Sequence, residues 1–198
     1  MRALVVLALA LVVLPFAPAS ASAQESVPID PPRLRFGVDV GGGLAWDADA
    51  RLGAAMHGSV RAGVQLDRFF ALYYQGRVAG AALDHDTVRT VWLVTTTNGL
   101  GFDVTLLDLF QFGGALALDY LAGDSCDGGR LCFGPAEGFY LGVDVRVALI
   151  AFAETNELTG DRSGMIVSAT WHTTPLPDQE STAGALHTVT LDLGWELF

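Results

Sequence analysis

Two residues that could act as a nucleophile and a base lie close together early in the chain. His57-Gly58-Ser59 places an imidazole and a hydroxyl two residues apart, and therefore on one face of a strand. Such a pair needs a third group that orients the base, and the sequence offers no assignable acid for that role. We therefore expect two polar side chains that fill space inside the fold, and we predict no catalytic residue.

Two further groups could bind a metal ion or form a covalent link. Asp84-His85-Asp86 carries metal-binding residue types, but one short acidic tripeptide is a weak signal, and we interpret it as a solvated loop. Cys126 and Cys132 are the two cysteines of the chain and supply too few ligands for a metal site. They predict a local disulfide formed in an oxidising compartment, dispensable because it closes only a short loop. We expect no metal and no cofactor.

Composition and charge exclude several classes of protein. The chain has 198 residues, of which 51% are hydrophobic and 17% charged, which is not the composition of a disordered segment. Its formal net charge is -11, and its 11 basic residues are all arginines that stand singly. A nucleic-acid binder needs clustered cations to neutralise phosphates, so this class is excluded.

The chain begins with the three parts of a secretory signal. Met1-Arg2 precedes an apolar run from Ala3 to Phe16, and Ala21-Ser22-Ala23 forms a small-x-small cleavage site. The run is too short for a transmembrane helix. We predict a signal peptide at 1–23, a proline-containing periplasmic lead-in at 24–33 and one domain at 34–198, so that the protein is exported.

The rest of the chain alternates between apolar and polar or small residues with a period of two. This pattern predicts eight strands, each long enough to cross a bilayer at the tilt of a barrel. Tight turns at 66–69 and 107–109 alternate with long polar connections at 47–55, 84–89, 123–138 and 175–184, although the long connection at 154–163 falls on the short-turn side. The expected strands are 34–46, 56–66, 70–79, 92–106, 110–120, 139–149, 165–172 and 188–197.

One face of these strands is continuously apolar, and the other carries glycine, alanine and full charges at mid-strand. A soluble lipocalin-like barrel would point its large apolar residues inward, whereas small and charged residues suit the narrow interior of an outer-membrane barrel. We predict an all-β, eight-stranded antiparallel up-and-down transmembrane barrel. Its predicted interior charge network consists of Arg35, Asp39, Arg61, Arg77, Asp103, Asp119, Asp144 and Arg146.

Aromatic residues support the membrane interpretation because they collect at strand ends, where hydrocarbon meets headgroups. One predicted belt contains Trp46, Trp92, Tyr120, Phe139 and Trp171, and the other contains Phe70, Phe110, Phe152 and Trp195.

The signal, the eight alternating strands, the belts and the terminal Gly194-Trp195-Glu196-Leu197-Phe198 resemble the small outer-membrane β-barrel family of Gram-negative bacteria, which includes outer membrane proteins A and X. Members of that family usually end in an aromatic residue on the lipid-facing side, whereas Phe198 shares the parity of Glu196. His57 and Ser59 also resemble the His-x-Ser pair of the lipid A deacylases, but in that family the pair faces outward and lies late in the chain.

These observations lead to an expected function and two alternatives. We expect a monomeric barrel in the outer membrane of a Gram-negative bacterium with a structural or surface-interaction role, whose side-chain-filled interior forms no general diffusion pore. Its expected partners are outer-membrane lipid, lipopolysaccharide and the barrel-assembly machinery, and not nucleic acid. The alternatives are a lipid A deacylase-like enzyme and a soluble periplasmic lipocalin-like barrel. Val143→Arg should block assembly, while Gly142→Ser should be tolerated if the interior has room.

Overall fold

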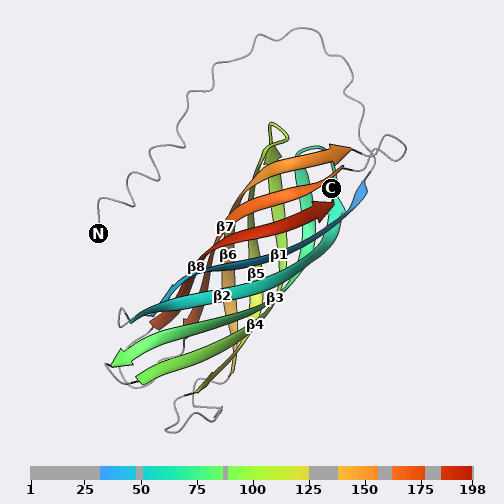
Figure 1. Cartoon of the computed structure of the whole chain (residues 1–198). Helices are drawn as coiled ribbons and strands as arrows, with labels where there is room; N and C mark the ends of the chain where they lie inside the picture. Colours follow the sequence, from blue (N-terminus) through green and yellow to red (C-terminus); the bar gives the residue numbers. More distant parts are fainter. Residues whose placement is uncertain are drawn as a thin grey trace, which may run out of the picture.

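A computed structural model describes residues 32–47, 51–86, 89–124, 138–155, 162–176 and 184–197. These residues form a closed barrel in which each strand pairs antiparallel with the next and β8 closes the sheet on β1 (Figure 1). The predicted eight-stranded antiparallel fold is confirmed. The strands are β1 (Arg33–Trp46), β2 (Leu52–Gln65), β3 (Phe70–Asp86), β4 (Arg89–Leu106), β5 (Phe110–Asp124), β6 (Gly138–Thr155), β7 (Arg162–Leu176) and β8 (Gly184–Leu197).

Several strands are longer than the alternation predicts. β2 begins at Leu52, β3 continues to Asp86 and β4 begins at Arg89, so the long loops expected at 47–55 and 84–89 are wrong. Asp84-His85-Asp86 accordingly ends a strand. The extra pairs join Gly53, Ala54 and Ala55 to Leu83, Ala82 and Ala81. Small residues on both faces give no contrast between inside and outside, and the alternation therefore predicts strands that are too short.

The two faces of the sheet have opposite chemistry. Along β6, Val143 and Val145 are exposed on the outer surface while Asp144 and Arg146 are buried inside. The same alternation recurs in every strand, because successive side chains of a strand point to opposite faces. The described parts of the chain contain no helix that is long and apolar enough to cross a membrane.

The β2–β3 and β4–β5 turns lie at the end of the barrel where β1 starts and β8 finishes. In the first, the carboxylate Oδ1 of Asp67 accepts hydrogen bonds from the backbone N–H groups of Phe69 and Phe70, both at 2.7 Å. In the second, Leu107 and Asp108 have φ angles of 55° and 53°, and the N–H of Leu109 donates to Leu106 O at 3.1 Å. Two consecutive positive φ values define a type I′ turn.

An apolar cluster fills the opposite end of the interior. Its residues come from the ends of six strands, and Tyr140 packs against it. The cluster places bulky hydrocarbon where the sequence predicted only small or polar interior residues, and it consists of Ala45, Ala55, Ala81, Leu83, Leu93, Leu121 and Leu186.

Several predicted features lie outside the described residues. They are the signal peptide at 1–23, nearly all of the lead-in, the Cys126–Cys132 disulfide and the terminal Phe198. The lead-in was expected to end at Arg33, but β1 already includes that residue.

Candidate functional site in the charged interior

All eight charged residues that the sequence assigns to the interior are buried there, with exposed fractions between 0 and 7%. Hydrogen bonds and ion pairs connect these residues and their neighbours into three groups. The predicted network of four arginines and four aspartates is incomplete, because the buried charged residues of the described strands also include Asp192 and Glu196.

The first group is centred on Glu196 near the turn end. A single Nη2 atom of Arg35 donates to Oδ2 of Asp103 at 2.7 Å and to Oε2 of Glu196 at 2.9 Å. Nη1 of Arg61 lies 3.3 Å and Nη1 of Arg146 lies 3.8 Å from Oε1 of Glu196. Arg35 in β1 and Asp103 in β4 are not on neighbouring strands, so this group crosses the interior.

The second group joins β3 to β6 and β5 to β7. Nη1 of Arg77 lies 2.8 Å from Oδ1 of Asp144, whose Oδ2 accepts a 2.7 Å hydrogen bond from Gln75. His172 contacts Asp144 through Nδ1 and Asp119 through Nε2, both at 2.9 Å. Asp119 therefore contacts a histidine, and it also accepts hydrogen bonds from Thr97 and Thr174.

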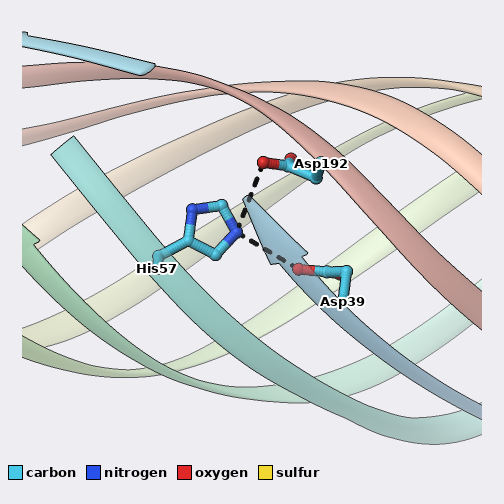
Figure 2. A group of neighbouring side chains, drawn as sticks. All are labelled: Asp39, His57 and Asp192. Carbon is cyan, nitrogen blue, oxygen red and sulfur yellow. Dashed lines mark hydrogen bonds and ion pairs between the residues drawn. The ribbon is translucent and has the colours of Figure 1, made fainter. Parts of the chain in front are cut away.

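The third group lies on the adjacent strands β8, β1 and β2. Figure 2 shows the carboxylates of Asp39 and Asp192 on either side of the imidazole nitrogen Nε2 of His57. This atom lies 3.2 Å from Oδ1 of Asp39 and 3.6 Å from Oδ1 of Asp192. The other oxygen of Asp39, Oδ2, accepts a 2.8 Å hydrogen bond from Arg61.

The His57 and Ser59 pair faces the interior, as the alternation predicts, and both side chains are buried. The Ser59 hydroxyl donates to Oδ1 of Asp39 at 2.8 Å, the same oxygen that lies near His57. The structure thus places the carboxylate of Asp39 beside the pair, an arrangement that could not be predicted from the sequence. The geometry differs from that of a catalytic triad, in which the base accepts the proton of the nucleophile and the acid contacts the far side of the base.

Inward glycines make room for four of the buried carboxylates. A Cβ atom at Gly41 would overlap the carboxylate of Asp192, and one at Gly113 would overlap that of Asp103. Asp119 occupies the same kind of space beside Gly142, and Glu196 that beside Gly37. The room on which the expected tolerance of Gly142→Ser depends is therefore already filled by the Asp119 carboxylate.

The predicted aromatic residues whose side chains the structure describes lie on the outer face. The rings of Trp46 and Trp171 stack on His187, with centroids 5.3 and 6.0 Å away, and Tyr120 lies 5.1 Å from Phe139. Phe70 stacks on Phe102, which was not assigned to a belt. The remaining predicted residues lie in the strands at Trp92, Phe110, Phe152 and Trp195.

Sequence reasoning missed Glu196 and His172 as members of the network, although their parity already placed both inward. Glu196 lies on the same face of β8 as Asp192. His172 carries a charge only when its imidazole is protonated, so it does not belong to the permanently charged residues of the predicted network.

Fold and site together define a closed eight-stranded barrel with a charged, hydrogen-bonded interior and an apolar exterior. No family model matches the chain, and no curated protein matches it. Among solved structures, the chain is similar to the crystal structure of Neisserial surface protein A, with a TM-score of 0.52 and 12% sequence identity. The match covers 84% of this chain and 98% of that protein, so the two share the fold of the whole barrel.

Proposed function

We propose that this chain is an integral outer-membrane β-barrel protein with a structural or surface-interaction role. The apolar exterior carries this proposal. Large hydrophobic side chains are exposed on all eight strands; for example, Leu34, Leu100, Leu116, Leu141 and Leu191 are each at least 70% exposed. Soluble monomers rarely expose contiguous apolar patches of more than a few hundred Å². Lipid is the solvent that such a surface requires.

The interior supports a membrane barrel over a soluble ligand-binding barrel. A lipocalin-like protein lines its cavity with apolar side chains, whereas here the middle of the interior contains arginines, carboxylates and glutamines in mutual contact. The strands contain 14 to 18 residues, more than the roughly 9–11 needed to cross the hydrocarbon. The similar barrel from Neisseria is itself named a surface protein.

The same geometry favours a non-enzymatic role. His57 and Ser59 are buried among charged side chains inside the barrel, on the side away from lipid. A lipid-modifying enzyme needs its nucleophile at the lipid surface. We further propose that the protein is a monomer whose partners are outer-membrane lipid, lipopolysaccharide and the barrel-assembly machinery.

Membrane fractionation of Gram-negative cells expressing the protein, combined with a substitution on the outer face, tests the proposal. The unmodified protein should remain in the outer-membrane fraction after a urea wash. Val143→Arg should abolish assembly, since an arginine near the bilayer midplane costs about 2–4 kcal/mol, while the matched variant Val143→Leu should assemble normally. Recovery of unmodified protein in the soluble periplasmic fraction, or normal assembly of Val143→Arg, would refute it.

A further inference from the structure

Among the residues that the structure describes, one group has three metal-ligand atoms within 4.8 Å of one another: Nε2 of His57 and a carboxylate oxygen from each of Asp39 and Asp192. We propose that this group binds a divalent transition-metal ion such as Zn²⁺ inside the barrel. The inference goes beyond the proposed function and does not depend on it.

Two of the three distances between the ligand atoms fit a tetrahedral ion, and the third is within 4.8 Å. Zinc with bonds of about 2.0–2.2 Å holds its ligand atoms roughly 3.3–3.6 Å apart. The distances from Nε2 of His57 to Oδ1 of Asp39 and Oδ1 of Asp192 are 3.2 and 3.6 Å. An imidazole nitrogen with two carboxylate oxygens is a ligand set that favours zinc over Mg²⁺ or Ca²⁺, which prefer oxygen alone. The fourth position remains for water.

An unsatisfied atom of Asp192 points into this space. The Asp192 side chain is 0% exposed, and its Oδ1 accepts no hydrogen bond from the described residues. Its other oxygen, Oδ2, accepts hydrogen bonds from the hydroxyls of Thr170 at 2.6 Å and Ser168 at 3.4 Å. A buried oxygen without a donor costs free energy, and a bound cation would remove that cost.

Neighbouring groups fix the orientation of His57 and Asp192 by hydrogen bonding and packing, as is common around metal ligands. Nδ1 of His57 lies 3.2 Å from the Thr190 hydroxyl, which can accept its proton and leave the lone pair of Nε2 for the ion. Gly41 pairs with both His57 and Asp192, and a side chain at this glycine would displace the Asp192 carboxylate. The orientations of His57 and Asp192 therefore depend on Thr190 and Gly41.

The buried charges of the interior are predominantly negative, which also favours a bound cation. Two more carboxylates than arginines are buried within the described strands. Among the residues that the structure describes, no arginine forms an ion pair with Asp192, and His57 is its potentially cationic contact. The His172 imidazolium between Asp119 and Asp144 offsets one of these two carboxylates. Buried charges persist when they are paired or coordinate a metal, and a cation bound at Asp192 would offset the other.

The second buried histidine does not offer the same geometry. Both ring nitrogens of His172 already lie 2.9 Å from a carboxylate oxygen, Nδ1 from Asp144 and Nε2 from Asp119. An imidazolium that donates from both nitrogens satisfies these contacts, so no lone pair remains for a metal. His172→Gln is therefore a matched control for His57→Gln.

Zinc binding by the purified protein in detergent micelles tests the proposal. After unfolding with a chelator and refolding in excess ZnCl₂, the dialysed protein should retain one zinc per chain by elemental analysis. Zinc at about 100 times its dissociation constant should raise the thermal midpoint by about 5–10 °C, followed by circular dichroism, whereas MgCl₂ should not. No retained zinc, or an equal shift with magnesium, would overturn the proposal.

Variants locate the ion. Asp192→Asn keeps the shape of the side chain and should lose the zinc and the thermal shift, as should His57→Gln, while His172→Gln should keep both. Thr170→Val leaves all three ligands in place and should weaken binding about tenfold, because it frees the Asp192 carboxylate. Zinc that remains on Asp192→Asn would assign it to another group, such as His85 or the cysteines, and would contradict this site.

Discussion

Glycine and carboxylate positions are coupled inside this barrel at the scale of single residues. Gly113 pairs directly with Asp103, Gly41 with Asp192 and Gly37 with Glu196, and in each pair the absent side chain leaves the space that the carboxylate fills. A narrow barrel has room for a charged network only if some inward positions carry no side chain. The glycines are therefore part of the network although they carry no charge.

Gly142→Ser tests this coupling. The serine would displace the Asp119 carboxylate and should lower the free energy of unfolding by about 1–3 kcal/mol, measured by urea titration in detergent. Gly76→Ala is the control, because a Cβ atom there would meet nothing within 4 Å. Equal stability of the two variants would mean that the interior has more room than the structure shows.

Arg61 connects two of the three interior groups, since it contacts both Asp39 and Glu196. Arg61→Ala would leave two buried carboxylates without this partner and should cost about 3–5 kcal/mol. Arg68→Ala removes an arginine from the exposed β2–β3 turn and should change stability little. The midpoints of urea unfolding of the two variants measure this difference. A similar small effect of both substitutions would show that the ion pairs of Arg61 contribute little to stability.

At the scale of the element, the strands and their faces could be predicted because alternation is a local property of the sequence. The lengths of the connections could not, since Gly53 to Ala55 and Ala79 to Ala82 are small on both faces. The partners within the interior could not be predicted either. Arg35 and Asp103 are 68 residues apart, and their contact depends on the register of every strand between them.

The backbone of the β4–β5 turn is strained at a residue with a branched side chain. Leu107 has a φ of 55°, a left-handed conformation that costs a branched residue roughly 1–2 kcal/mol and that asparagine tolerates. Leu107→Asn should therefore raise the free energy of unfolding by about 1 kcal/mol. Leu109→Asn in the same turn lies outside the positive-φ pair and should bring no gain. A loss of stability on Leu107→Asn would indicate that lipid contact of the leucine outweighs the backbone conformation.

At the scale of the whole molecule, the interior is obstructed by contacts between strands that are not neighbours. Gln75 of β3 reaches Asp144 of β6, and Gln111 of β5 reaches Glu196 of β8. We predict little or no stable conductance when the protein is reconstituted in a planar bilayer, and greater destabilisation than channel opening in Asp119→Ala. Long-lived channels formed by the unmodified protein would make a small transporter the better interpretation.

The proposed membrane location requires lipid contact along the outer face of the barrel, and spin-label accessibility in lipid vesicles measures this contact. In a chain with Cys126→Ser and Cys132→Ser, labels would be attached at Leu116→Cys, in mid-strand and 72% exposed, and at Leu107→Cys in the turn. The label at position 116 should be relaxed by oxygen and shielded from a water-soluble nickel chelate, whereas that at 107 should show the reverse. Ready access of the nickel chelate to both positions would contradict a membrane-spanning barrel.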